Sequence, residues 1–190
     1  MKKQFLLLAG ITILFVGLTN NTVGAQQKEV ASKSVEVKLV DNLDDERGYC
    51  FDLVGRAYNP NITNLLQVNT CLSYRGGLGS DQAILTNDIA ERKFRITEFD
   101  VCMTATEATV GGGIILAPCE DKPLQDFTMT PEGRIILTQY PELCVTASDK
   151  DKTECKGGRP THVMRPVYLD KIDARKDSYQ LWVLREEIRP

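Results

Sequence analysis

Residues 180–182 read Gln-Leu-Trp, a glutamine followed two positions later by a large apolar side chain. The same pattern occurs as Gln82-Ala83-Ile84 and as Gln125-Asp126-Phe127. The three glutamines are separated by 43 and 55 residues. A motif that recurs at such a period predicts an architecture built from internal repeats.

A cysteine-containing apolar segment precedes each of these motifs. The three segments are Tyr49–Leu53, Val101–Ala105 and Leu143–Ala147, and their cysteines lie 52 and 42 residues apart. Between the cysteine segment and the glutamine motif, each repeat has a second apolar stretch, at residues 65–71, 114–119 and 163–169. Each repeat is therefore predicted to contain at least three short strands, with insertions in the loops.

A fourth short strand follows in the first two repeats, at residues 93–96 and 133–137, whereas the chain ends soon after Trp182. Ahead of the first repeat, residues 35–39 alternate apolar and charged side chains in the order Val-Glu-Val-Lys-Leu. We predict that this segment supplies the missing strand and closes the barrel, because closure removes an exposed sheet edge.

Turn-forming residues separate these short segments. Clusters such as Asn59-Pro60-Asn61, Gly76-Gly77 and Gly111-Gly112-Gly113 lie between them, and the glycine triplet is predicted to be a hairpin turn. A helical period of useful length is not found, although residues 87–91 are expected to form one short turn. The pattern indicates an all-β domain.

Six cysteines lie beyond the N-terminal apolar run: Cys50, Cys71, Cys102, Cys119, Cys144 and Cys155. An even number after an export signal predicts disulfides, and six cysteines allow 15 pairings. We expect the sequential pairing 50–71, 102–119 and 144–155, since each pair then falls within one repeat. Each bridge would stabilise the fold by roughly 2–4 kcal/mol. A metal site is not expected, because no C-x-x-C occurs and His162 is the only histidine.

The N-terminus has the features of a secretory signal peptide. Lys2 and Lys3 precede an uncharged apolar run from Phe5 to Leu18, and Val23-Gly24-Ala25 offers small residues for cleavage. The alternative, a membrane anchor, requires roughly 20 apolar residues, more than this run contains. We expect a signal peptide at 1–25, a flexible leader at 26–34 and one domain at 35–190, secreted or periplasmic.

The charge of the exported chain excludes some partners. Loss of the two positive charges at Lys2 and Lys3 would change the net charge from −3 to −5. A mildly acidic domain without a basic run has no electrostatic reason to bind nucleic acid or an anionic membrane surface. Membrane insertion after signal removal is likewise not expected.

The arrangement resembles the ricin-B-type, or R-type, lectins. The residues that carry the resemblance are Cys50-Phe51-Asp52, the three Gln-x-apolar motifs and Gly133-Arg134-Ile135-Ile136, within residues 49 to about 184. The resemblance implies a β-trefoil, in which a six-stranded barrel is capped by three hairpins with pseudo-threefold symmetry, here stapled by disulfides. It implies no cofactor.

The resemblance also implies where a sugar would bind. By position, the first repeat supplies Asp52, Gln67, Asn69, Asp81 and Gln82. Asn69 stands where the family has an aromatic ring that covers the sugar face, so Tyr74 or Tyr58 would have to supply a ring. In the second and third repeats, Thr104 and Thr146 replace the family's Asp, and both sites are expected to be inactive.

Structural interpretations of the same residues remain open. The glutamine amides would satisfy backbone groups in a turn, and the large side chains two positions later would pack in the core. Asp52 would be a turn carboxylate that accepts backbone N–H bonds.

Three classes of function follow. The leading prediction is a secreted carbohydrate-binding module with at most one intact, weak site for a galactose-like or related glycan. The alternative is a degenerate trefoil scaffold that binds a surface protein. An enzyme is not expected, because no nucleophile elbow, zinc motif or phosphate loop occurs. His162 is expected to be a surface or hairpin histidine.

Overall fold

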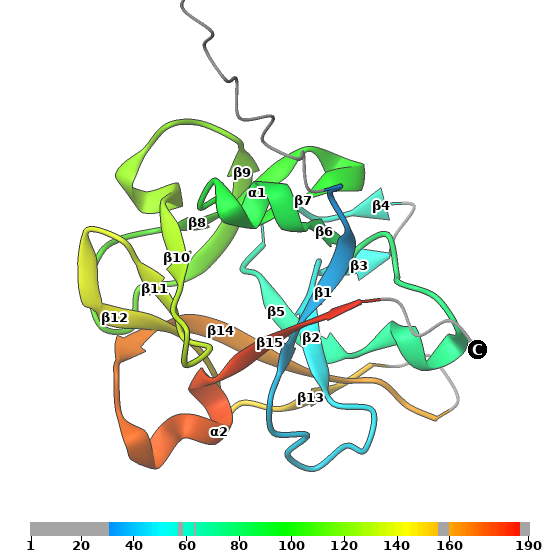
Figure 1. Ribbon diagram of the computed structural model, residues 1–190. Helices are drawn as coiled ribbons and strands as arrows, with labels where there is room; N and C mark the ends of the chain where they lie inside the picture. Colours follow the sequence, from blue (N-terminus) through cyan, green and yellow to red (C-terminus); the bar gives the residue numbers. More distant parts are fainter. Residues whose placement is uncertain (1–30, 57–58, 63, 156–159, 187–190) are drawn as a thin grey trace, which may run out of the picture. The chain divides into compact units, whose positions relative to one another are not determined.

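The computed structural model describes residues 31–56, 59–62, 64–155 and 160–186 (Figure 1). The predicted signal peptide lies outside the described residues. Of the predicted leader, residues 31–34 are described, and Ser34 already begins the first strand, β1 (Ser34–Leu39). Within the described residues, no helix has the length and apolar character needed to cross a bilayer.

Three antiparallel hairpins form one part of the domain. They are β2 (Tyr49–Asp52) with β5 (Gln67–Thr70), β8 (Val101–Ala105) with β9 (Ile114–Pro118), and β12 (Tyr140–Ala147) with β14 (Val163–Lys171). Neighbouring hairpins contact one another at equivalent positions, through the pairs Leu65–Ile115, Gly113–Tyr168 and Gln67–Pro166. The three-fold relation inferred from the repeats is therefore present in the hairpins.

Six further strands form the ring that the hairpins cap. They are β1, β6 (Ile84–Leu85), β7 (Arg95–Ile96), β10 (Phe127–Met129), β11 (Ile135–Leu137) and β15 (Trp182–Glu186). The prediction that residues 35–39 supply the missing strand is confirmed, because β1 pairs with β15 from Val35–Glu186 to Leu39–Trp182. It also pairs with the cysteine strand of the first repeat, as Lys38–Cys50.

The ring is not closed, and this corrects the predicted barrel. Ladders join β15, β1, β6 and β7 into one group and β10 with β11 into another. At the two open seams single backbone bonds remain, from Phe127 N–H to Arg92 O (3.1 Å) and from Trp182 N–H to Gly133 O (2.7 Å). The second seam requires glycine, since Gly133 has φ +95° and a Cβ there would lie 2.6 Å from the Trp182 carbonyl.

The remaining elements are short. They are α1 (Thr86–Ala90), α2 (Asp177–Gln180), the 3-10 helices η1 (Leu72–Arg75), η2 (Thr97–Phe99), η3 (Pro123–Gln125) and η4 (Ala174–Lys176), and strands β3 (Gly55–Arg56), β4 (Asn59–Pro60) and β13 (Thr153–Glu154). The expected turn near 87–91 is α1, and the glycine triplet at 111–113 connects β8 to β9.

One apolar core unites the repeats. The large residues of the three glutamine motifs, Ile84, Phe127 and Trp182, are all at most 1% exposed. The Trp182 ring lies 4.6 Å from that of Phe51, and its Nε1–H donates to Val145 O at 3.1 Å. The structural interpretation of these apolar residues is confirmed.

Two of the three predicted disulfides are present. Cys50 is bonded to Cys71 and Cys102 to Cys119, whereas Cys144 and Cys155 are free. The 144–155 prediction is wrong because Cys144 pairs with Asp170 on β14, whereas β13, just before Cys155, pairs near Val163. At ~3.3 Å per residue these points are roughly 20 Å apart. The position equivalent to Cys71 and Cys119 is Ile172.

Candidate functional site

The glutamine of each repeat anchors a corner of the fold. In the second repeat, Gln125 Oε1 accepts from Glu120 N–H (2.7 Å), and its Nε2 donates to Thr104 Oγ1 and to Pro118 O (both 2.9 Å). The Thr104 hydroxyl in turn donates a hydrogen bond to Cys102 O (3.0 Å). Every polar atom of this corner is therefore satisfied.

The third repeat repeats this arrangement. Gln180 Nε2 donates to Thr146 Oγ1 (3.0 Å) and to Lys171 O (2.9 Å), and its Oε1 accepts from Asp173 N–H (3.0 Å). The Thr146 hydroxyl donates to Cys144 O at 3.2 Å. The structural interpretation of the glutamines is thus confirmed in both repeats.

The first repeat departs from the pattern because Asp52 occupies the threonine position. Gln82 Oε1 still accepts from Leu72 N–H (2.9 Å), and Asn69 Nδ2 donates to Asp52 Oδ2 (2.5 Å). However, Asp52 Oδ1, Asn69 Oδ1 and Gln82 Nε2 are buried and have no hydrogen-bond partner among the described residues. The Gln82 amide still lies near enough to the Asp52 carboxyl to lower its pKa.

Burial controls the protonation of this corner. Asp52 is 2% exposed, and burial, reinforced by the nearby Asp81 carboxylate, raises its pKa to about 8. Interactions with the Asn69 and Gln82 amides and with the Leu53 backbone N–H oppose that rise only in part. Burial also raises the pKa of Asp81, which packs so closely on Gly79 that a Cβ there would lie 2.6 Å from Asp81 Oδ1.

The predicted sugar-site residues of the first repeat come together. Asp52 pairs with Gln67 across β2 and β5, and Asn69 lies two residues further along β5 on the same face. Asn69 occupies the place of the family's aromatic ring, and its amide binds the carboxyl that a sugar would need. Tyr74 belongs to η1, but its side chain, like all of Tyr58, lies outside the described residues.

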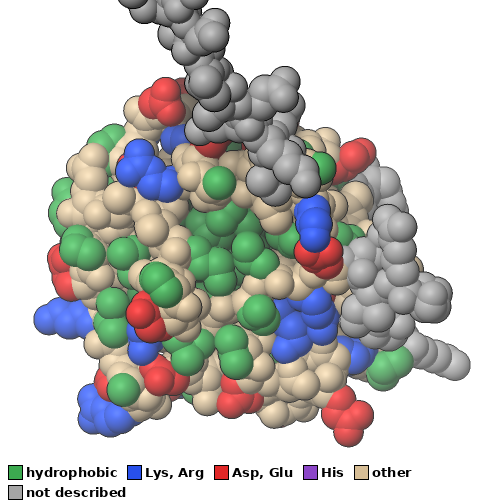
Figure 2. Space-filling view, in the orientation of Figure 1, with side chains coloured by type: hydrophobic (Ala, Val, Ile, Leu, Met, Phe, Trp, Pro, Cys, Tyr) green, Lys and Arg blue, Asp and Glu red, His purple; other side chains and the backbone are tan. Residues whose placement is uncertain are grey.

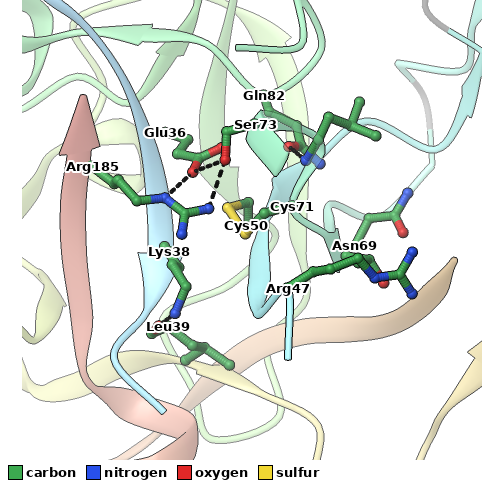
Figure 3. The surroundings of a disulfide bond; sticks show 12 residues. Glu36, Lys38, Leu39, Arg47, Cys50, Asn69, Cys71, Ser73, Gln82 and Arg185 are labelled. Carbon is green, nitrogen blue, oxygen red and sulfur yellow. Dashed lines mark hydrogen bonds and ion pairs between the residues drawn. A yellow bond between two sulfur atoms is a disulfide. The ribbon is translucent and has the colours of Figure 1, made fainter. Parts of the chain in front are cut away.

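A buried ion pair lies beside the Cys50–Cys71 disulfide (Figure 3). Glu36 on β1 is 0% exposed, and it binds the Arg185 guanidinium from β15 and the Ser73 hydroxyl from η1 (2.8 Å). Arg185 also donates to Ser73 Oγ at 2.7 Å. The pair fixes η1, which follows Cys71, against the ring.

An open pocket of about 280 Å³ adjoins Gln67. It is lined by Val54, Asn64, Leu65, Leu66, Gln67, Thr153, Met164, Arg165 and Pro166, which come from the first and third repeats. Most of its side chains are aliphatic. Sequence reasoning missed this pocket, although Pro166 inside a predicted strand was a signal, because proline cannot donate to a sheet ladder.

Among the described residues, one group of potential metal ligands occurs, Glu36 with the sulfurs of Cys50 and Cys71, and these sulfurs are bonded to each other. His162 lies at the β13–β14 turn, where its backbone oxygen accepts from Cys155 N–H (2.9 Å). Its side chain is 7% exposed, so the predicted surface position is wrong whereas the hairpin position is confirmed.

No family model matches this sequence, and no curated protein matches it. Solved structures do. The Abrus precatorius agglutinin aligns with a TM-score of 0.58 at 17% identity over 82% of this chain and 49% of the agglutinin chain. This chain therefore spans about half the length of that protein.

Two shorter lectin domains align almost over their whole length. A mutant of the earthworm lectin C-terminal domain, solved with 6′-sialyllactose, gives a TM-score of 0.55 at 15% identity over 82% of this chain and 99% of that domain. The Vibrio vulnificus hemolysin/cytolysin β-trefoil lectin, solved with N-acetyl-D-lactosamine, gives a TM-score of 0.51 at 13% identity over 85% of this chain and 99% of that domain. The chain has the β-trefoil fold of the R-type lectins.

Proposed function

We propose that this protein is an exported, non-enzymatic carbohydrate-binding module whose single glycan site is the Asp52 corner of the first repeat. One observation carries the proposal. Among the described residues, Asp52 Oδ1, Asn69 Oδ1 and Gln82 Nε2 lack hydrogen-bond partners, whereas the threonine and glutamine side chains at the Asp52 and Gln82 positions of the other repeats are satisfied. Sugar hydroxyls both donate and accept hydrogen bonds, so they can satisfy all three atoms.

The relatives agree with this proposal. The earthworm and Vibrio domains of the same fold were solved with glycans bound. Glycan binding here would be weak for two reasons. The Asn69 side chain must first leave Asp52, and no aromatic residue occupies position 69. We therefore expect a dissociation constant near millimolar, about −4 kcal/mol, for a single sugar.

The test is titration of the mature domain with galactose and N-acetylgalactosamine, followed by a glycan array. Asp52→Asn should abolish binding, because it replaces one of the two carboxyl oxygens by an NH2 donor and removes the charge while keeping the shape of the side chain. Thr104→Asn, at the equivalent position of the second repeat, is the matched control and should leave binding unchanged. Loss of binding in both variants, or no binding by the parent at millimolar sugar, would contradict the proposal.

Export is the second part of the proposal, and it is supported by the order of charged, apolar and small residues in 1–25. The intact mass of the protein recovered from culture medium or periplasm should correspond to a chain that begins at Gln26. Recovery of the full-length chain from the membrane fraction would contradict it.

A protein-binding trefoil is the second candidate, and the burial of Asp52 favours it. A trefoil that had lost sugar binding would no longer need to present this carboxyl. This candidate gains support if the glycan array is negative and a surface protein is retained by the immobilised parent but not by a Leu65→Ser variant.

A further inference from the structure

A buried hydrogen-bonded cluster joins the first and last strands of the domain to the segment after Cys71. Ser73 Oγ donates to Glu36 Oε1 (2.8 Å) and accepts from the Arg185 guanidinium (2.7 Å). Glu36 lies on β1 and Arg185 on β15, and Figure 3 shows both side chains converging on Ser73. The Ser73 cluster, which consists of these three side chains, therefore holds η1 by one hydroxyl.

The burial of this cluster indicates a role beyond stability. On the face that Figure 2 shows, acidic and basic side chains are scattered over the surface. The Glu36 side chain, in contrast, is 0% exposed, and its Oε2 has no hydrogen-bond partner among the described residues. Because burying an ion pair costs desolvation free energy, apolar residues of similar volume often stabilise a fold as well or better. The cluster is better explained by the conformation that it fixes.

η1 connects the cluster directly to the glutamine of the first corner. Leu72, which precedes Ser73, donates its N–H to Gln82 Oε1 at 2.9 Å. Because its oxygen is bound there, the Gln82 amide presents its NH2 group to the corner, where it acts on the Asp52 carboxyl. If the amide turned over, its oxygen would face the carboxyl, and two acceptors cannot form a hydrogen bond. The position of Leu72 therefore decides which group of Gln82 faces the corner.

At the position of Ser73, the other two repeats have exposed residues. These are Asp121 in the second repeat and Ala174 in the third, each directly after the residue whose N–H binds the glutamine of the motif. The Asp121 side chain is fully exposed, and Ala174 is exposed and has no polar side-chain atom. The buried cluster thus occurs in the repeat whose corner has unsatisfied atoms.

We propose that Ser73 is a positioning residue for the glycan site, held in place by Glu36 and Arg185. The inference rests on the proposed function and adds the residues that keep Gln82 in its binding orientation. Ser73 is 2% exposed, so it acts on a bound sugar through Leu72 and Gln82 and does not touch it. Because Glu36 and Arg185 lie on the first and last strands, the site is complete only when those strands pair.

The test removes the hydroxyl and leaves the ion pair in place. In Ser73→Ala, η1 loses its link to Glu36, and the Gln82 amide should no longer be held in one orientation. We expect the affinity for galactose, measured by NMR titration, to fall about ten-fold, as for the loss of one hydrogen bond. The side-chain amide signal of Gln82, assigned with Gln82→Glu, should shift or broaden, whereas the signals of Gln125 and Gln180 should stay in place.

Two further variants separate positioning from a general loss of stability. Ser73→Thr keeps the hydroxyl, so it should restore both the galactose affinity and the Gln82 signal. Asp121→Ala, at the equivalent position of the second repeat, is the matched control and should leave galactose binding unchanged. Thermal unfolding of each variant checks that it is folded at the temperature of the titration.

The outcomes keep the two proposals apart. If Ser73→Ala binds galactose as the parent does, while Asp52→Asn abolishes binding, the positioning role is overturned and the glycan site stands. The positioning role is also overturned if the three glutamine signals move together, because the effect is then a general loss of structure. If the parent does not bind galactose, both proposals fail.

Discussion

The Gln82 corner of the first repeat and the Gln125 corner of the second have the same backbone framework but differ in one side chain. In the second repeat, the Thr104 hydroxyl both accepts from Gln125 and donates to Cys102 O. In the first, an ionised Asp52 can only accept, and it is buried beside a second carboxylate. One substitution thus converts a satisfied structural corner into a strained polar cluster, and four predictions test this contrast.

The largest effect is expected from Asp52→Thr, which makes the first corner like the second. A carboxyl whose folded pKa is raised from 3.8 to about 8 favours folding fully below pH 4, and that stability is lost as the pH rises to 8. Threonine does not titrate, so the variant keeps its stability at pH 8. Its free energy of unfolding at pH 8 should exceed that of the parent by on the order of 5 kcal/mol. Urea unfolding at pH 4 and pH 8 measures the free energy of unfolding of both proteins. The same change between the two pH values in parent and variant would refute the prediction.

Next is the buried Glu36–Arg185 ion pair, compared with the Arg134–Asp177 pair that joins the second and third repeats. Arg185→Leu should destabilise the fold by about 3–4 kcal/mol, because Glu36 is left buried and uncompensated. Asp177→Ala should cost at most about 1 kcal/mol, since Asp177 is 43% exposed.

The double variant Glu36→Leu with Arg185→Leu is the control for this prediction. It should recover most of the lost free energy of unfolding, as replacement of a buried pair by apolar groups usually does. If it is no more stable than Arg185→Leu alone, the uncompensated charge is not the cause.

The disulfides distinguish the first two repeats from the third. Replacing both Cys50 and Cys71 by Ala should cost about 3 kcal/mol. In the parent, iodoacetamide should modify one cysteine in the folded state, the exposed Cys155, and two after denaturation without reductant. Intact mass reports the count. A denatured parent with no modified cysteine would restore the 144–155 bridge.

The smallest effect belongs to the second corner itself. Thr104→Val should cost about 1 kcal/mol, because Gln125 Nε2 keeps its bond to Pro118 O. The cost should be the same at pH 4 and pH 8, since no ionisable group is removed. A pH-dependent cost would show that the corners are not equivalent frameworks.

The repeat pattern predicted the scaffold well for a physical reason. Ile84, Phe127 and Trp182 must reach one shared core, and the glutamine side chains must accept from backbone N–H groups in the turns. Because both requirements apply once per repeat, they produce a motif that recurs in the sequence. The role of residues 35–39 was also predictable, because an unfilled strand position demands a partner. The alternation of apolar and charged residues in 35–39 predicted which face of the sheet each side chain lies on. It did not predict the complete burial of Glu36, which depends on Ser73 and Arg185 from distant segments.

The sequence by itself determined the threefold β architecture and the identity of the odd corner at Asp52, since both follow from comparing the three repeats. Only the tertiary structure decided the open seams of the ring and the pocket beside Gln67, because both depend on which segments of different repeats meet. It also decided the separation of Cys144 from Cys155, which depends on where β12 and β13 pair along β14. Burial is also a property of the assembled fold, so the raised pKa of Asp52 could not be read from its neighbours in the chain.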